Sequence, residues 1–404
     1  MKSSRVVCVH IGARAHYLLP KALHVKKNLI VLVTDTWIAS PVIQKLLHNV
    51  PLRLVQSFAH RYSPAIPKLI VCSSGLYFAW MEISLRLFYA NGWLRIIARN
   101  NLFQNWANHI LRKQKTYTAV LGISYTSVKV FQTAKKNGKR TILYQMDPAL
   151  GEERIVYQLI EENKEKYPTS WEKAPELYWQ HWKEECSLAD CIMVNSDWSR
   201  KALIQEGIEA EKIHIVPLPF ELGDAHLEFN RTYPQRFQAQ RPLICLFLGT
   251  LTLRKGIHLV LDAAQRMKNE HIEFILVGNS ELEVDWKAYP NVSYKGVCSR
   301  AETEYWYKQA DVFLFPTFSD GFGLTQLEAM AWKLPVIAST NCGAVVQQAV
   351  NGMILTECTT EQLVLLLQNC LNEPTLLKEL SVHCQDRVSE FSVNRFAEQL
   401  AELL

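Results

Sequence analysis

Several patterns that would assign a common function are missing from this sequence of 404 residues. No H-E-x-x-H, no C-x-x-C pair and no tight Cys/His cluster occurs, so neither a catalytic nor a structural zinc site is predicted. No Walker-type G-x-x-x-x-G-K-[ST] is present and no G-x-G-x-x-G follows the first predicted strand, which removes the usual signals of P-loop and dinucleotide sites. With 49% hydrophobic and 21% charged residues and no fixed repeat, the chain is expected to fold throughout as a globular protein.

Long apolar runs are also scarce at the start of the chain. The first run covers residues 6–11, which is too short for the core of a signal peptide or for a membrane span. The ten cysteines are scattered and mostly lie in apolar surroundings, as free thiols in a reducing compartment do. We therefore expect a cytoplasmic protein.

Acidic residues are almost missing from the N-terminal part of the chain. Residues 1–140 contain 21 Lys and Arg but only Asp35 and Glu82, a formal charge of +19, whereas residues 141–404 carry −14. This asymmetry implies an anionic partner, such as the inner face of a membrane or an acidic or lipid-linked acceptor. The alternative is a solvated basic surface that the acidic part balances across a domain interface. A nucleic-acid partner is not expected, because no reader motif accompanies the charge.

Two α/β units are predicted from the alternation of short apolar runs with helical stretches. The alternation stops between Pro217 and Pro242, where prolines and polar residues without a period indicate a linker, and it restarts afterwards. The predicted fold class is α/β, with two Rossmann-like, doubly wound parallel sheets that face each other across a cleft. The predicted domains cover residues 1–220 and 221–388. Ligands of such sheets bind beyond the carboxyl ends of the strands, so the site is expected in the cleft.

Residues 76–112 combine aromatic, aliphatic and basic side chains. Glu82, Arg86 and Arg95 exclude a membrane span here, although an interfacial helix or an apolar cradle for an acceptor would have this composition. A core helix with solvated arginines is the alternative.

The stretch SDGFGLTQLEAM, residues 319–330, places two carboxylates around a glycine-rich corner. It follows a predicted buried strand and precedes a predicted helix, so Gly321 and Gly323 occupy the corner and the first N–H groups of the helix favour an anion there. Glu328 lies about one turn into this helix, and its carboxylate could accept hydrogen bonds from two adjacent hydroxyls, such as those of a ribose. Taken alone, such a pattern arises by chance more often than through function.

A second stretch, FLGTLTLRKG, strengthens this interpretation. A buried strand is predicted to end at Gly249, and Arg254 and Lys255 stand just before Gly256 and the next helix. Two cations beside a helix start can clamp a diphosphate, the arginine through its planar fork and the lysine as a point charge. Solvated loop charges near a helix cap are the alternative.

Together these stretches resemble the GT-B glycosyltransferases of family 4. FLGTLTLRKG is similar to their phosphate-binding loop and SDGFGLTQLEAMAWKLPVIAS to their E-x₇-E donor motif, with a weaker likeness over most of residues 185–358. The resemblance implies a retaining enzyme that moves a sugar from a nucleoside diphosphate to an acceptor hydroxyl on a glycan, a lipid or a small molecule. It also implies no cofactor and no metal ion, and a C-terminal helix within residues 389–404 that crosses back to the first domain.

The roles known in the family transfer to the matching positions. Glu328 is expected to bind the ribose hydroxyls and Asp320 the hydroxyls of the donor sugar, while Arg254 and Lys255 neutralise the leaving diphosphate. Arg254, Lys255 and Asp320 are thus the expected catalytic residues, and the leaving phosphate itself accepts the proton of the acceptor. The other expected donor-binding positions are the corner residue Gly321, the main-chain N–H groups of Phe322, Gly323 and Leu324, the turn residue Gly12, and Val297, which contacts the base through its main chain.

The sequence departs from the family pattern in three places. Asp320 replaces the usual glutamate and is one methylene shorter, which puts its contact with the donor sugar in question. Thr250 stands where many members have an arginine, whose charge Arg254 could supply instead. The acceptor-side histidine of the family has no match in the N-terminal domain, and the candidates at comparable strand ends are Ser124, Tyr125 and Asp147.

Two other functions fit the same residues. A glycoside hydrolase would use Asp320 and Glu328 as a carboxylate pair across a scissile bond, but it gives no reason for the neighbouring cations and helix-start amides. A non-catalytic nucleotide-sugar sensor or scaffold could use the same fold, and the departures at Asp320 and Thr250 keep this alternative open.

Overall fold

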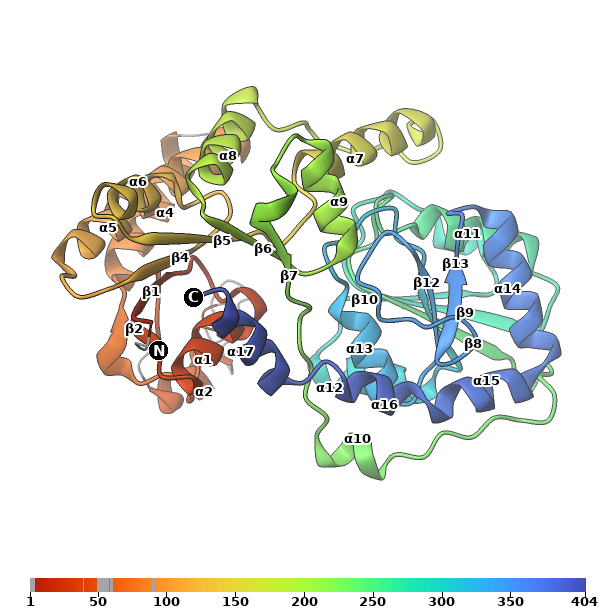
Figure 1. The fold of residues 1–404 in the computed structure, drawn as a ribbon. Helices are drawn as coiled ribbons and strands as arrows, with labels where there is room; N and C mark the ends of the chain where they lie inside the picture. The colour runs from red at the N-terminus through yellow and green to blue at the C-terminus, as the bar shows by residue number, and fades with distance from the viewer. Residues whose placement is uncertain (1–3, 39, 49–57, 59–60, 89–91) are drawn as a thin grey trace.

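The computed structural model describes residues 4–38, 40–48, 58, 61–88 and 92–404 of the chain (Figure 1). Its strands form two parallel sheets, one from each part of the sequence, which confirms the predicted fold class. The first sheet has seven strands in the order β3-β2-β1-β4-β5-β6-β7. These strands are β1 (Val6–Val9), β2 (Leu29–Val33), β3 (Val71–Cys72), β4 (Ala119–Ile123), β5 (Arg140–Tyr144), β6 (Cys191–Val194) and β7 (Ile213–Ile215).

The second sheet has six strands in the order β10-β9-β8-β11-β12-β13. In each sheet the strand order reverses direction beside the first strand, between β1 and β4 and between β8 and β11. Ligands of open α/β sheets bind at such a switch point, so these two points mark where a site belongs. The strands are β8 (Leu243–Leu248), β9 (Ile272–Val277), β10 (Val292–Gly296), β11 (Val312–Phe315), β12 (Val336–Ser339) and β13 (Gly352–Leu355).

Helices cover both faces of each sheet (Figure 1). This accounts for the continuous apolar runs in the sequence, since β4, β6, β11 and β12 are buried at every residue. The helices of the first half are α1 (Leu18–Val25), α2 (Pro41–His48), α4 (Gly75–Phe88), α5 (Gly92–Lys113), α6 (Val128–Lys136), α7 (Leu150–Asn163), α8 (Glu176–Leu188) and α9 (Asp197–Gln205). Those that follow are α10 (Asp224–Glu228), α11 (Ile257–Arg266), α12 (Arg300–Gln309), α13 (Leu324–Ala331), α14 (Thr360–Asn372), α15 (Pro374–Val382), α16 (Cys384–Ser389) and α17 (Val393–Glu402).

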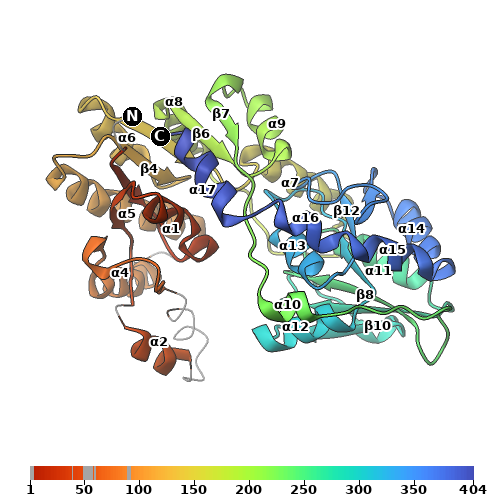
Figure 2. The same cartoon turned by 60° about the horizontal axis from the view of Figure 1, so that its bottom comes forward.

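The last helix of the chain returns to the first half. Helix α17 lies against α1 in both ribbon views (Figures 1 and 2). On the way, the amide of Phe220 in the forward connection donates to the carbonyl of Phe391 in the returning one, at 2.8 Å. The two halves are therefore joined by two chain segments that run side by side.

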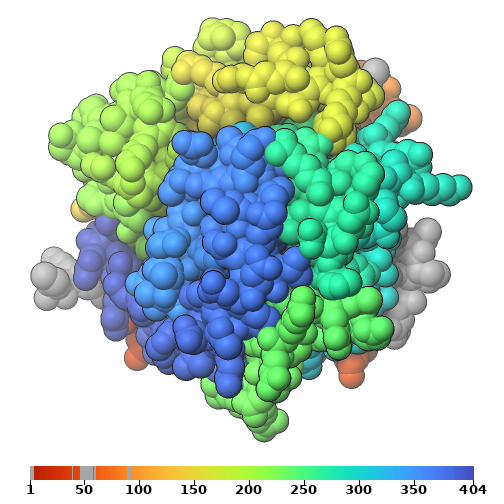
Figure 3. All heavy atoms as spheres, turned by 90° about the vertical axis from the view of Figure 1, so that its right-hand side faces the viewer, coloured from red at the N-terminus to blue at the C-terminus, as the bar shows by residue number. Residues whose placement is uncertain are grey.

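Helix α7 also connects the halves. Leu159 and the following Tyr167 are buried within the core of the second sheet, and Lys166 pairs with Asp262 of α11 at 2.5 Å. Figure 3 shows this yellow segment lying along the upper edge of the C-terminal half. Part of the predicted first domain thus packs on the second sheet, and the division at residue 220 stays a prediction.

The cysteines and helices bear on two further expectations. All ten cysteines are free, and seven of them are buried, as predicted from their apolar surroundings. Within the described residues, none of the helices is both long enough and apolar enough to cross a bilayer. The stretch 76–112 contains two helices, α4 and α5, and residues 89–91 between them lie outside the described part.

Candidate active site

The corner between β11 and α13 is packed directly against the first half of the chain. A Cβ added at Gly321 would lie 2.0 Å from the carbonyl oxygen of Met146, just beyond β5, so only glycine allows this approach. Gly323 caps α13 with φ near 80°, in the left-handed region that favours glycine. Gly321, predicted with Gly323 to form the strand-to-helix corner, therefore also allows the close contact between the two halves.

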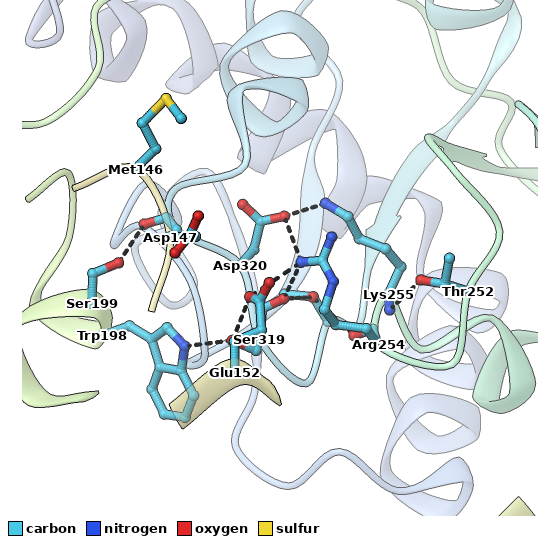
Figure 4. A network of polar contacts seen from close by, with 12 residues as sticks. Met146, Asp147, Glu152, Trp198, Ser199, Thr252, Arg254, Lys255, Ser319 and Asp320 are labelled. Atoms are coloured by element: carbon cyan, nitrogen blue, oxygen red, sulfur yellow. Dashed lines mark hydrogen bonds and ion pairs between the residues drawn. The ribbon is translucent and has the colours of Figure 1, made fainter. Parts of the chain in front are cut away.

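Asp320 sits at this corner among the predicted cations (Figure 4). Its Oδ2 forms an ion pair with Lys255 Nζ and lies 3.7 Å from Arg254 Nη1, while Oδ1 accepts the amide of Phe322 at 3.0 Å. Burial would raise the pKa of Asp320, but Lys255 and Arg254 outweigh burial and lower it. The structure thus brings together the three residues predicted to be catalytic.

A fourth charged residue completes this network from the opposite half (Figure 4). Glu152, in the first turn of α7, accepts a hydrogen bond from Ser319 Oγ at 2.8 Å and lies 3.4 Å from Arg254 Nη1. Burial raises the pKa of Glu152 to about 7, although the nearby Arg254 acts in the opposite direction. No local pattern predicts a role for Glu152, because α7 brings it to a partner 102 residues away in the sequence.

The N-terminus of α13 offers some, but not all, of the amide groups that were predicted to bind an anion. The amides of Gly323, Leu324 and Thr325 donate to no acceptor among the described residues. The Phe322 amide departs from the expectation, because it already donates to Asp320. An anion at this helix start would meet three amides together with Arg254 and Lys255.

Glu328 lies in the second turn of α13, as predicted. Its Oε2 accepts a hydrogen bond from Tyr307 Oη at 2.9 Å, and among the described residues no donor contacts Oε1. Burial raises the pKa of this carboxyl, against the effect of the Tyr307 hydroxyl. The carboxylate is therefore oriented on one oxygen and available on the other.

The remaining donor-side candidates lie at strand ends. Gly12 follows β1 with φ near 73°, no side chain crowds the position of its absent Cβ, and its amide donates to Asp35 Oδ1 at 2.9 Å. Val297 follows β10 and is 59% exposed. Neither residue contacts the charged network in the described part of the chain, so their donor contacts stay predictions.

The acceptor-side candidates separate into two groups. Tyr125 Oη donates to Asp147 Oδ1 at 2.5 Å, and both residues line a cavity of about 360 Å³ between the two halves, together with Arg254. Ser124 is fully buried, and its Oγ has no hydrogen-bond partner in the described structure. Ser124 does not line the cavity, and its role on the acceptor side stays a prediction.

The arrangement offers charge and hydrogen-bond donors for an anionic group. Among the described residues, no group of three or more His, Cys, Asp or Glu side chains is placed to hold a metal ion. Asp320 and Arg254 lie in the loops that follow β11 and β8, and these two strands flank the switch point of the second sheet. The network therefore lies where an α/β sheet binds its ligand.

A family model matches part of the second half of the chain. Residues 242–373 match the family model described as "Glycosyl transferases group 1". The likeness to the group 1 glycosyltransferases is thus a finding for this stretch of the C-terminal half. The stretch contains both the loop with Arg254 and Lys255 and the corner with Asp320 and Glu328.

Curated group 1 relatives match over part of their length. O-antigen chain mannosyltransferase B of Escherichia coli is 32% identical over 170 residues, which are 39% of this chain and 45% of that protein. An uncharacterised 41.2 kDa protein in the cps region of Klebsiella pneumoniae is 28% identical over 170 residues, 41% of this chain and 48% of that protein. The sequence matches thus span about half the length of these relatives.

Solved structures show that the whole chain has the GT-B fold. The structure of HepE from Anabaena in complex with UDP covers 98% of both chains with a TM-score of 0.61 at 16% identity. Sucrose-phosphate synthase from Thermosynechococcus elongatus covers 99% of this chain and 98% of its own, with a TM-score of 0.62 at 18% identity. These likenesses confirm the predicted fold, a pair of facing parallel sheets, for the whole chain.

Proposed function

We propose that this chain is a retaining glycosyltransferase that moves a sugar from a nucleoside diphosphate sugar to an acceptor hydroxyl. The observation that carries the proposal is that Asp320 holds Arg254 and Lys255 at the corner that leads into the N-terminus of α13, where the amides of residues 323–325 are unpaired among the described residues. HepE has been solved with UDP and with UDP-glucose, and this supports a nucleoside diphosphate sugar as the donor.

The geometry suits stabilisation of a leaving diphosphate. As the anomeric C–O bond breaks, negative charge grows on the diphosphate oxygens beside the two cations and the amides of residues 323–325. Preorganised donors of this kind contribute roughly 3–4 kcal/mol each to the transition state. The acceptor oxygen forms the new bond on the face that the diphosphate leaves, and its proton passes to a diphosphate oxygen. The two cations would supply the charge that a metal ion supplies in other transferases.

The ion pairs with Asp320 and Glu152 have a role in this proposal. The four side chains carry no net charge when both carboxyls are ionised, so they hold the cations in place without a ligand. A bound diphosphate would compete with Glu152 for Arg254, whereas Lys255 and Asp320 would stay in contact and leave Asp320 beside the donor sugar.

Release of nucleoside diphosphate tests the proposal. Purified protein is incubated with UDP-, GDP- and ADP-sugars and a panel of acceptors, and both the diphosphate and the glycosylated product are measured. Replacing Arg254 and Lys255 by Ala should abolish transfer, whereas Lys268→Ala, an exposed lysine beyond α11, should leave it unchanged. Transfer that persists without both cations would contradict the proposal.

A non-catalytic nucleotide-sugar sensor is the second candidate. It is favoured by the pairing of both cations with carboxylates, which reduces the positive charge open to a donor. Binding of a nucleoside diphosphate sugar with no product from any acceptor would support the sensor over the transferase.

We also propose that the protein contacts an anionic membrane at the inner face of the cell through α4. Leu76, Trp80, Ile83 and Leu87 follow one another at spacings of four, three and four residues, so they share one face of the helix, and each is at least 61% exposed. The opposite face is buried through Phe78, Met81 and Leu85. Helix α4 is therefore apolar on its outer face as well as its inner one, and it lies in the part of the chain with charge +19.

A further inference from the structure

The cavity between the two halves has an aromatic wall that the donor site does not use. Trp93 of α5, Tyr125 after β4, and Tyr178 and Trp179 of α8 form this wall with Trp171 from the preceding loop. The ring of Tyr178 stacks on Tyr125 with centroids 4.9 Å apart and meets Trp93 edge-on at 5.1 Å. These contacts hold the rings in place before any ligand arrives.

Carboxylates form the polar part of the same cavity. Asp147, Glu152, Glu153 and Glu281 line it, and among the described lining residues Arg254 is the one basic side chain. Arg254 is already close to Glu152 and Asp320. The cavity is therefore acidic, although the N-terminal part of the chain is strongly basic. An acceptor with a phosphate group placed among these carboxylates, away from Arg254, would be repelled.

Asp147 is the carboxylate best placed to contact a ligand. Its Oδ1 accepts three hydrogen bonds, from Tyr125 Oη at 2.5 Å, Gln145 Nε2 at 2.8 Å and the amide of Ala149 at 3.0 Å. In the described structure no donor contacts Oδ2. Glu153, in contrast, is held on both oxygens by Trp179 Nε1 and the amide of Ala174. Asp147 is thus fixed on one side and open on the other.

We propose that this cavity binds the acceptor and that the acceptor is an uncharged saccharide, an inference that rests on the proposed transferase function. The C–H face of a sugar ring packs on aromatic rings, and its hydroxyls donate to carboxylates such as Asp147. At about 360 Å³ the cavity is near the lower end of small-molecule sites, so it suits the terminal residue of a glycan.

The position of the cavity fits the proposed reaction. Arg254 and Thr252 border it on the side of the second sheet, so a saccharide there lies next to the cations that would hold the diphosphate. Asp147 is assigned as a positioning residue that orients the attacking hydroxyl through its Oδ2. In this proposal the basic residues of the N-terminal part contact something other than the acceptor. The acceptor is uncharged, whereas the overall charge suggested an anionic one.

Binding of simple sugars tests the proposal without a donor. Ligand-observed NMR on the full chain compares neutral methyl glycosides of glucose, mannose and galactose with the matching sugar phosphates. At least one methyl glycoside is expected to bind, and its phosphate should bind at least tenfold more weakly. Trp171→Ala should weaken the neutral sugar about two- to tenfold, as expected for one lost aromatic contact. Trp80→Ala, a tryptophan of α4 outside the cavity, should change nothing.

Two further variants separate charge from shape. Glu281→Lys should improve binding of the sugar phosphates, and Asp147→Asn should raise the KM for the acceptor while the KM for the donor stays the same. The proposal would be overturned if the unchanged protein bound the sugar phosphates more strongly than the neutral sugars, or if it bound neither class. Equal effects of Trp171→Ala and Trp80→Ala would also overturn it. Nucleoside diphosphate binding is measured on the same samples. If the protein does not bind nucleoside diphosphate, the proposed transferase function is in doubt. The sugar-binding result is independent of this outcome, because it is measured without nucleotide.

Discussion

At the scale of single residues, the candidate site is a set of charges that satisfy one another until a ligand arrives. Lys255 and Asp320 form an ion pair, and Arg254 lies between Asp320 and Glu152. Burying a cation or a carboxylate without a partner costs free energy. In the cleft, each charged group is therefore stabilised by a neighbour of opposite charge. The pairing keeps both cations at the α13 N-terminus, where the proposed diphosphate would bind.

Replacing Glu328 by Ala should weaken use of the donor by tenfold or more. The change removes the acceptor proposed for the ribose hydroxyls, and a hydrogen bond to a charged group contributes roughly 1.5–3 kcal/mol. The KM for the donor and the dissociation constant of the nucleoside diphosphate give the measurement. Glu379→Ala, at an exposed position of α15, is the matched control. Kinetics like those of the unchanged protein would refute the role of Glu328.

The pKa of Glu152 makes nucleotide binding depend on pH. This carboxyl has a pKa of about 7, so it is ionised at pH 8, where it pairs with Arg254, and it is largely protonated at pH 6. Nucleoside diphosphate should therefore bind roughly three- to tenfold more tightly at pH 6 than at pH 8. Calorimetric titration at several pH values measures this change.

The variant Glu152→Gln separates this effect from titration of the nucleotide itself. It cannot ionise, so its affinity at pH 8 should exceed that of the unchanged protein and should vary less with pH. An unaltered pH dependence in Glu152→Gln would mean that another group titrates.

At the scale of elements, the corner between β11 and α13 combines a ligand site with a contact between the halves. Gly321→Ala would place a Cβ 2.0 Å from the Met146 carbonyl oxygen, and the backbone on one side must move. Such overpacking costs roughly 1–3 kcal/mol. We expect a lower melting temperature and a turnover reduced more than tenfold.

A second glycine provides the control for this change. A Cβ at Gly223 would meet nothing closer than His226 Nδ1 at 3.6 Å, an ordinary contact, so Gly223→Ala should have little effect on turnover. Equal turnover in both variants would show that the tight approach at Gly321 is not needed for activity.

Local patterns in the sequence predicted most elements near the site but not those that long-range packing decides. The strands before Arg254 and Asp320 are continuous apolar runs, and the glycines that follow them mark the corners. No strand is predicted at β13, because its four residues have no distinctive period. The contact of Glu152 with Arg254 could not be predicted, because it depends on how α7 packs between the halves.

At the scale of the whole molecule, the charge of the chain and the charge of the cleft differ in sign. The N-terminal part carries +19, whereas the charged residues that line the cavity between the halves are four carboxylates and Arg254. We therefore expect the basic residues of the N-terminal part to act outside the cleft. The exposed apolar face of α4 belongs to the same part of the chain, and a combination of apolar and basic residues is typical of proteins that bind anionic membranes.

Vesicle flotation tests this contact with the full chain. The protein should bind vesicles that contain anionic lipid at low salt, because each well-placed Lys or Arg contributes about 1 kcal/mol at a charged surface. Binding should weaken at high salt, since screening shortens the range of these interactions. Replacing Leu76, Trp80 and Leu87 by Ser should reduce binding at least tenfold at low salt, because the apolar contribution is lost. The same change at Leu365 and Val382, exposed apolar residues of the C-terminal half, should not. Equal binding to neutral and anionic vesicles, or equal binding by both sets of variants, would contradict a membrane contact through α4.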